Sequence, residues 1–275
     1  MSALSYQDIV KDYGNFHLGP VTLSIPEGYV TGLVGVNGAG KTTLIKLALG
    51  LIHPTSGTVN TCNHEKIGVI YDTPSMSGHW KVIDFAKVMQ RFYASWNQSE
   101  FDRLLEWGGI DKRKKVNQLS RGMGMKLQFA TALAHDAKFL ILDEPTSGLD
   151  PLARHELLDM IADFMMDETN SVLFSTHITS DLARVADHLV LLHQGQLISS
   201  GSTSDILDEY RLVRGASEDL CTVQDQVVGL RQHSAGWEGL IRTEDTVALS
   251  GRNAQVQEPT VDELLIHLTQ GATHV

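Results

Sequence analysis

The stretch YVTGLVGVNGAGKTTLIKLALGL, Tyr29–Leu51, decides the fold of this chain. It begins with apolar and β-branched residues, passes through a glycine-rich loop and ends in a helix-forming segment. Within it, Gly35 to Thr42 fit the pattern G-x-x-x-x-G-K-[ST] without a gap. Glycine leaves backbone N–H groups free to converge on phosphate oxygens, which a Cβ atom would obstruct. The stretch therefore predicts a strand, a phosphate-binding loop and a helix.

This loop supplies the residues expected to bind a nucleoside triphosphate. Lys41 would reach the β- and γ-phosphates, and the hydroxyl group of Thr42 would coordinate Mg²⁺. A glycine-rich turn with a chance Lys-Thr pair is the alternative, and the flanking strand and helix argue against it. Besides Lys41 and Thr42, the residues assigned to the phosphate cradle are Asn37, Gly38, Ala39, Gly40 and Thr43.

A second buried strand, Phe139 to Leu142 in AKFLILDEPTSGLDP, ends in two acids. Asp143 would hold Mg²⁺, and Glu144 at the rim would polarise the attacking water. An acidic turn after a strand is the alternative, but a P-loop requires such an acid for its metal. Because two adjacent carboxylates can divide the metal and base tasks, hydrolysis is favoured over binding alone.

Two further motifs place polar groups where ligands bind. In SVLFSTHITSDLARVAD, His177 follows a buried strand at the edge where α/β sheets bind ligands, so a γ-phosphate contact is favoured over a structural role. In QLSRGMGMKLQFA, a polar turn opens a helix whose free backbone N–H groups attract anions. The chain thus has a second phosphate-binding helix start besides its P-loop.

Composition and charge narrow the function classes. With 275 residues, 42% hydrophobic and 20% charged, the chain is expected to be a soluble globular domain with an appendage. The formal net charge of -11 argues against a nucleic-acid partner, because nucleic-acid binders show a basic face. The basic run DKRKK, residues 111–115, is interpreted as a solvated helix end or loop.

The sequence also favours a cytoplasmic location. Cys62 and Cys221 are too few for a disulfide framework and suit a reducing compartment. No stretch approaches the ~20 apolar residues that a membrane helix needs. The N-terminal stretch MSALSYQDIVKDYG lacks the apolar core of a signal peptide. Any role at the membrane would therefore depend on a partner.

The P-loop, LSRGM, LILDEP, SGLD and STH, in this order over roughly residues 1–200, resemble the nucleotide-binding subunit of ABC transporters. In that family two subunits form a head-to-tail dimer with two ATP molecules at the interface. The resemblance implies that Ser120 and Gly122 belong to the signature loop, which contacts the γ-phosphate of ATP held by the opposite subunit. A dimer of this kind explains why one chain carries two phosphate-binding helix starts.

The same resemblance assigns further roles. Glu144 matches the catalytic base, His177 the switch histidine and Asp150 of SGLD the D-loop aspartate. Tyr13 of VKDYG matches the aromatic residue that stacks on adenine, with Phe16 close by and simple packing as the alternative.

Three positions depart from the family's pattern. The signature is usually L-S-G-G-Q, and here Arg121 replaces its first glycine while Met123 replaces its glutamine. Because Ser120 and Gly122 are retained, and a cation beside a triphosphate is tolerable, we expect a working signature. In KIGVIYDTPSM, Asp72 aligns with the family's Q-loop glutamine. Aspartate is shorter and negatively charged, so Asp72 is expected either to coordinate Mg²⁺ and the water or to tie the loop to a membrane partner.

The expected fold is an α/β P-loop NTPase core with a helical subdomain and a small C-terminal α+β extension. Residues 1–200 would form the ATPase domain, with the helical subdomain at about 73–117, and 201–275 an accessory region. In the helical part the apolar residues cover more than one face, which indicates core packing or contact with a partner. In the accessory region, CTVQDQVVGLRQH and WEGLIRTEDTVALSG resemble short strands, and Thr260 and Glu263 have capping-box spacing.

The function implied by the resemblance is an ATPase subunit that dimerises on ATP and powers a separate integral membrane permease. The signature, DEPTSGLDP, STHI and the C-terminal segment look like bacterial ABC-2 type exporter ATPases for peptides, antibiotics or lipid-linked substrates. ATP and Mg²⁺ are the cofactors, a second copy or a homologous subunit is the dimer partner, and the permease would hold the chain at the inner face of the cell membrane.

Two other functions stay open at this point. A soluble ABC ATPase acting on ribosomes or DNA is disfavoured, because such proteins usually carry two cassettes in one chain or a long coiled-coil insertion, and this sequence shows neither. The negative net charge disfavours it further. A P-loop small-molecule kinase leaves the signature residues and the two-acid strand end without a role.

Overall fold

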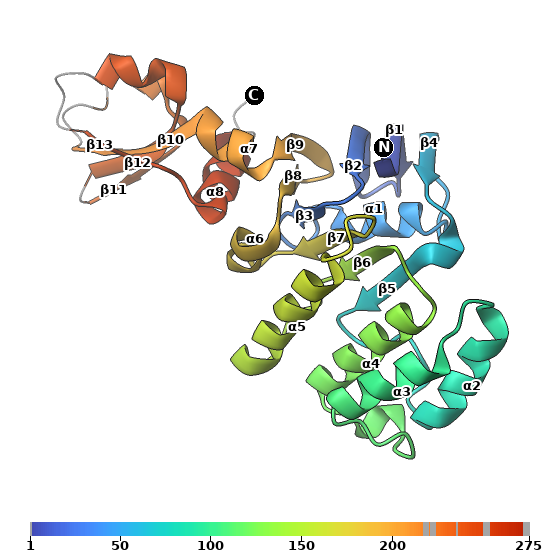
Figure 1. The fold of residues 1–275 in the computed structure, drawn as a ribbon. Coiled ribbons are helices and arrows are strands. Elements are labelled where there is room, and N and C mark those ends of the chain that lie inside the picture. The colour runs from blue at the N-terminus through green and yellow to red at the C-terminus, as the bar shows by residue number, and fades with distance from the viewer. Residues whose placement is uncertain (1, 217–219, 221–223, 235, 250–253, 272–275) are drawn as a thin grey trace.

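The computed structural model describes residues 2–216, 220, 224–234, 236–249 and 254–271, and Cys221 lies outside this part of the chain. Figure 1 shows a central sheet between two lobes, one made of helices and one built around a second sheet near the C-terminus. The predicted α/β core with a helical subdomain and a C-terminal α+β extension is confirmed.

A six-stranded sheet forms the centre of the molecule. Its strands, in spatial order, are β5 (Ile67–Tyr71), β6 (Phe139–Asp143), β7 (Ser171–Thr176), β3 (Val30–Val34), β8 (His188–His193) and β9 (Gln196–Ser202). The first five run parallel, and β9 is added antiparallel at the edge. Every residue of β6, β7 and β3 is buried, because both faces of the sheet are covered. The three predicted buried strands, at the P-loop, before the acids and before His177, are therefore central strands.

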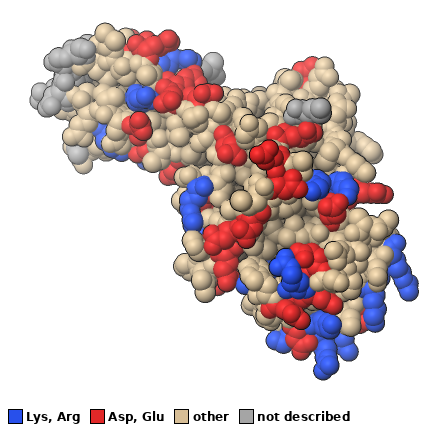
Figure 2. All heavy atoms as spheres, in the orientation of Figure 1, with Lys and Arg blue, Asp and Glu red and all other residues tan. Residues whose placement is uncertain are grey.

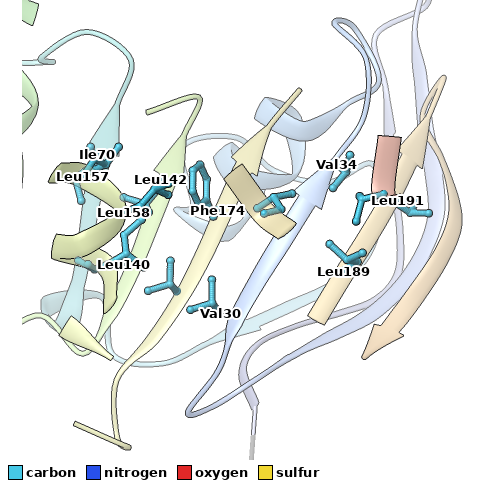
Figure 3. Close-up of a cluster of buried hydrophobic side chains, with 14 of the residues drawn as sticks. Val30, Val34, Ile70, Leu140, Leu142, Leu157, Leu158, Phe174, Leu189 and Leu191 are labelled. Carbon is cyan, nitrogen blue, oxygen red and sulfur yellow. The ribbon is translucent and has the colours of Figure 1, made fainter. Parts of the chain in front are cut away.

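One face of the sheet packs against α5 (Pro151–Phe164). Figure 3 shows Leu140, Leu142 and Phe174 of the sheet beside Leu157 and Leu158 of this helix, all within one buried cluster. This packing fixes the carboxyl ends of β6 and β7, from which the predicted acids and the switch histidine project.

The opposite face is covered by α1 (Lys41–Ala48), which begins directly after the P-loop, and by a three-stranded antiparallel sheet. Leu44 and Ile45 of α1 are fully buried in a cluster shared by both sheets. The helix is thus held on two sides, so its N-terminus is a fixed point of the fold. The other elements of this layer are β1 (Ser2–Asp12), β2 (His17–Pro26), β4 (Ser56–Thr61) and η1 (His64–Lys66).

The helical lobe interrupts the sheet between β5 and β6 and has its own apolar core (Figure 1). Phe85 and Phe101 are buried, whereas Trp80 is 43% and Phe92 75% exposed. The wide apolar surface predicted for this region is therefore divided between core packing and an open face. Its elements are α2 (Val82–Phe92), α3 (Gln98–Trp107), η2 (Val116–Gln118) and α4 (Arg121–Ala134).

The C-terminal lobe is a four-stranded antiparallel sheet with a helix on one face. Thr260 and Glu263 form the predicted capping box, since each backbone N–H donates to the other's side chain. The second predicted strand stops early, because the polar residues from Thr243 onwards form a 3₁₀ turn instead. The elements of this lobe are α7 (Thr203–Glu209), β10 (Tyr210–Gly215), η4 (Gln224–Gln226), β11 (Val228–His233), β12 (Gly236–Arg242), η5 (Thr243–Leu249), β13 (Gln255–Gln257) and α8 (Val261–Gly271). The short helix α6 (Thr179–Val185) lies between β7 and β8 in the chain and packs against the central sheet.

The C-terminal lobe shares its core with the central sheet. Leu212 of β10 and Leu264 of α8 belong to the same buried cluster as Phe174 of β7. The predicted division at residue 200 falls inside β9, and the boundary stays a prediction.

Candidate functional site

Lys41 occupies the first turn of α1, where the backbone leaves the P-loop. Its side chain is buried, and its ammonium group donates a 2.6 Å hydrogen bond to the carbonyl of Gly35. The same ammonium lies 3.2 Å from Oε1 of Glu144. Lys41 therefore points inward along the loop, and a carboxylate and a carbonyl surround its charge.

The shape of the loop depends on glycine. Gly40 adopts a φ of +111° as it enters α1, a conformation that strains residues with a Cβ atom. At Gly35 a Cβ atom would lie 2.4 Å from the carbonyl oxygen of Leu192 on β8. Glycine at these two positions therefore allows the loop to keep this shape, in which the N–H of Ala39 donates to the carbonyl of Val36 at 3.0 Å.

Thr42 and Asp143 meet where α1 faces the end of β6. The Thr42 hydroxyl group donates to Oδ2 of Asp143 at 3.0 Å, and Ser175 donates to Oδ1 at 3.2 Å. Burial raises the pKa of the Asp143 carboxyl above its usual value, although both hydrogen bonds favour the charged form. One carboxylate and one hydroxyl oxygen suit Mg²⁺, which prefers hard oxygen ligands and completes its shell with phosphates and water.

Glu144 lies between Lys41 and His177. One carboxylate oxygen faces Lys41, and the other lies 2.6 Å from Nδ1 of His177. The backbone of Glu144 has a φ of +52°, unusual for a residue other than glycine, and its N–H donates to the carbonyl of Ser175. This turn aims the side chain back over the sheet edge, so the predicted base and switch histidine are in direct contact.

Asp72 follows β5, whose last residue is the neighbour of Asp143 in the sheet register. Its carboxylate accepts a hydrogen bond from Thr73 and lies 3.7 Å from the guanidinium group of Arg121. Within the described residues it forms no hydrogen bond or salt bridge with Thr42 or Asp143. The two charged departures from the family's pattern are therefore paired with each other.

The signature residues lie at the start of α4. Ser120 is the N-cap, and its side chain accepts a hydrogen bond from the backbone N–H of Met123. A Cβ atom at Gly122 would lie 3.2 Å from that of Ala153 on α5, so this turn of the helix packs closely. In the part of the chain that the structure covers, no hydrogen bond or ion pair joins Ser120 or Gly122 to the residues around Lys41.

Asp150 caps α5, because its side chain accepts hydrogen bonds from the N–H groups of Leu152 and Ala153, both at 3.0 Å. This contact gives Asp150 a structural role beside the one predicted for it. Just before it, a Cβ atom built at Gly148 would lie 2.6 Å from Nη1 of Arg121. The guanidinium group of Arg121 is therefore packed onto the SGLD loop.

The remaining predicted residues surround the mouth of the P-loop. Tyr13 is 48% exposed, and the ammonium group of Lys11 lies 5.2 Å from the centre of its ring. Phe16 instead packs against the core beside α1, so the exposed ring is the one free to stack on a base. Asn37 and Gly38 are exposed, Ala39 is buried and Thr43 is half-buried.

Two residues of the site were not predicted from the sequence. Ser175 supports Asp143 from the neighbouring strand, and only the register of β6 with β7 places it there. Gln128 of α4 is buried, and its amide group both accepts from the N–H of Tyr71 and donates to the carbonyl of Tyr71, each at 3.0 Å. A glutamine on the apolar face of a helix was the available signal.

A groove of about 490 Å³ separates the end of the sheet from α2. The residues lining the groove include Tyr71, Trp80, Phe85, Met89, Phe92 and Gln128.

Figure 2 shows Lys and Arg residues gathered on the outer edge of the same helical lobe. None of the helices in the described ranges has the length and apolar character needed to cross a bilayer.

Comparison with known proteins identifies relatives of this chain. The profile of the ABC transporter family matches residues 18–147. The bacitracin transport ATP-binding protein BcrA of Enterococcus faecalis is 30% identical over 73% of this chain and 69% of its own. The lantibiotic transport ATP-binding protein SrtF of Streptococcus pyogenes is 36% identical over 71% of this chain and 89% of its own. A solved structure of the ATP-binding subunit of an ABC transporter has a TM-score of 0.67 and 28% identity, covering 74% of this chain and 92% of that one.

Proposed function

The chain belongs to the ABC transporter family as one of its ATP-binding proteins, and we propose that it is the ATPase subunit of a bacterial exporter whose permease is a separate polypeptide. Hydrolysis of ATP is the activity of the family's ATP-binding subunits. The observation that carries the proposal is the contact chain from Lys41 through Glu144 to His177, beside the pair of Thr42 and Asp143.

The roles within one subunit follow from these contacts. ATP phosphates would replace Glu144 as the partner of Lys41, because both offer negative oxygen atoms to the same buried ammonium group. Glu144, freed on that side and still hydrogen-bonded to His177, would then accept a proton from the attacking water. His177 would orient the carboxylate and contact the γ-phosphate, while the exposed ring of Tyr13 would stack on the adenine.

Thr42 and Asp143 are the proposed Mg²⁺ ligands, with Asp72 as an additional oxygen donor. The hydroxyl group and the carboxylate already face one another at 3.0 Å, so a cation between them needs little rearrangement. The metal would neutralise charge that builds up on the phosphates during hydrolysis.

A head-to-tail dimer with two ATP molecules is part of the proposal. In the described residues the N-terminus of α4, with Ser120 and Gly122, makes no polar contact with the P-loop of its own subunit. A free helix N-terminus attracts phosphate, so this one would serve the nucleotide of the opposite subunit. Asp150 lies at the start of α5, next to the turn of α4 that carries Gly122, and would face the same interface.

The groove between β5 and α2 is the proposed contact for the permease. Its rim carries the exposed rings of Trp80 and Phe92, and apolar rings of this kind at an open groove suit a helix of a partner protein. Tyr71 lines the groove directly before Asp72, so a helix bound there would touch the strand that leads to the nucleotide. Through the permease the chain would be held at the inner face of the cell membrane.

Among the expected cargoes, the names of the two relatives favour an antibiotic, since one is named for bacitracin and the other for lantibiotic transport. The exported compound itself would be recognised by the permease rather than by this chain.

The decisive experiment is the substitution Glu144→Gln. It removes the proton acceptor and keeps the size of the side chain, so we expect ATP binding to persist while steady-state hydrolysis falls at least about a hundredfold. The variant should also accumulate an ATP-dependent dimer in sedimentation velocity. Turnover close to that of the parent chain would show that Glu144 is not the base.

A further inference from the structure

We propose that Arg121 is a phosphate-binding residue that acts in trans. In the isolated subunit Asp72 holds its guanidinium group, and in the ATP-bound dimer the group leaves Asp72 and binds the triphosphate of the opposite subunit. This inference rests on the head-to-tail dimer of the proposed function and adds a ligand that the signature pattern does not contain.

The position of Arg121 suits this role. It is the first residue of α4, directly after the N-cap Ser120, so its side chain starts beside the free N–H groups that attract an anion. Its guanidinium group lies on Gly148, which has a φ of +67° and leaves no room for a Cβ atom. The cation is thereby held at the surface of the loop that joins Glu144 to Asp150.

The contact with Asp72 is suited to exchange. At 3.7 Å, Nη2 of Arg121 and Oδ2 of Asp72 are farther apart than in a hydrogen bond, and the side chains are 39% and 52% exposed. Exposed ion pairs of this kind contribute little to stability. A triphosphate offers more negative charge and pairs of oxygen atoms that match the planar guanidinium fork. Arg121 therefore has a weak partner within its own chain and a stronger one across the dimer.

The pair also explains how a carboxylate is tolerated near the nucleotide. Asp72 would repel a triphosphate, and Arg121 neutralises it while the site is empty. When Arg121 moves to the phosphate, its charge stays in the dimer interface, and the Asp72 carboxylate is released toward the proposed metal site. One exchange thus links the end of β5 to closure of the dimer.

The test uses the full chain in the Glu144→Gln background, where the ATP-bound dimer persists, and measures the dimer dissociation constant with ATP and Mg²⁺ by sedimentation. Arg121→Gln removes the trans ligand from both sites, so we expect at least about tenfold weaker dimerisation. Asp72→Asn frees Arg121, so we expect dimerisation to tighten about twofold to fivefold. A pair that only stabilised the subunit would shift both constants in the same direction.

Further variants separate the effect of releasing Arg121 from the direct effect of removing the Asp72 charge. Asp72→Asn alone also removes a charge that repels ATP and a proposed oxygen donor to Mg²⁺, so it is repeated with Arg121→Gln. The part of its effect that acts through Arg121 should disappear in that background, and only its direct effect on the nucleotide and the metal should remain. Arg121→Lys should recover part of the affinity. Arg103→Gln breaks an exposed, hydrogen-bonded pair with Glu100 on α3 and serves as the control for loss of a surface ion pair, with an unchanged constant expected.

Two results would overturn the inference: equal dimer constants for Arg121→Gln and the control, or an undiminished effect of Asp72→Asn in the Arg121→Gln background. Failure of the proposed function looks different, because Glu144→Gln itself would then form no ATP-dependent dimer.

Discussion

The ammonium group of Lys41 lies 3.2 Å from Oε1 of Glu144, so the residue proposed to bind the phosphates is paired with the proposed base. Neither charge is left unpaired in the buried loop, which would be costly. Because His177 holds the other oxygen of Glu144 at 2.6 Å, the carboxylate would keep its position when Lys41 turned to a phosphate. With the proposed roles, binding of ATP and release of the base would therefore be one event.

Replacement of Lys41 tests this relationship from the binding side. Lys41→Ala removes a buried cation that donates to the phosphates, so we expect the dissociation constant for ATP to rise about tenfold to a hundredfold. Titration calorimetry with Mg²⁺ and ATP measures the change. Lys46→Ala, an exposed lysine in the last turn of the same helix, is the control and should leave affinity unchanged. An unaltered constant for Lys41→Ala would place the phosphates elsewhere.

The raised pKa of the Asp143 carboxyl predicts that the free energy of unfolding of the nucleotide-free protein depends on pH. Burial raises the pKa of its carboxyl in the folded chain, so at a pH above both the folded and the unfolded pKa its charge costs stability. This cost decreases as the pH falls through the raised pKa and is gone below the unfolded value of about 4. Asp143→Asn carries no charge and should therefore raise the melting temperature of the nucleotide-free protein by about 2–4 °C at pH 8.

The measurement is thermal unfolding without ATP or Mg²⁺ from pH 8 down to pH 4, with hydrolysis assayed in parallel at pH 8. The advantage of the Asn variant should be constant while the pH stays above the raised pKa of Asp143, shrink as the pH falls through it and be lost near pH 4. Hydrolysis by the variant should be lost. A variant less stable than the parent at pH 8 would mean that the hydrogen bonds from Thr42 and Ser175 outweigh the burial of the charge.

The sequence alone predicted the elements whose residues act locally. The P-loop, the strand that ends at Asp143 and the capping box of Thr260 and Glu263 depend on short-range spacing, and each lies where the pattern indicated. The strand predicted after Trp237 was too long, because the turn at Thr243 competes with the sheet.

Contacts between segments far apart in the chain could not be predicted from the sequence. Asp72 and Arg121 are 49 positions apart in the sequence, and their pairing depends on how α4 crosses the end of β5. Alone, each residue was only a departure from a familiar pattern. The role of Ser175 likewise depends on strand register, which is set by the packing of the whole sheet.

The amide group of Gln128 joins α4, the helix that begins at the signature, to Tyr71 at the end of β5. Gln128→Leu fits the apolar surroundings but leaves the N–H and carbonyl of Tyr71 without the amide partner, so we expect a loss of about 2–4 kcal/mol in the free energy of unfolding. Because Tyr71 leads to Asp72, the rate of hydrolysis should fall as well. Urea unfolding measures the first effect, with the exposed Gln90→Leu on α2 as the control. Equal stability of the two variants would show that water replaces the amide.

The shared core predicts that the C-terminal lobe unfolds together with the ATPase domain. Leu264 of α8 is fully buried in the cluster that contains Phe174 of β7, so Leu264→Ala should cost about 2–5 kcal/mol and shift one common unfolding transition. Calorimetry and tryptophan fluorescence should report the same midpoint. Val247→Ala changes a residue of the same lobe that is 76% exposed and should have almost no effect. Two transitions, only one of them shifted by Leu264→Ala, would instead mean that residues 201–275 form an independent folding unit.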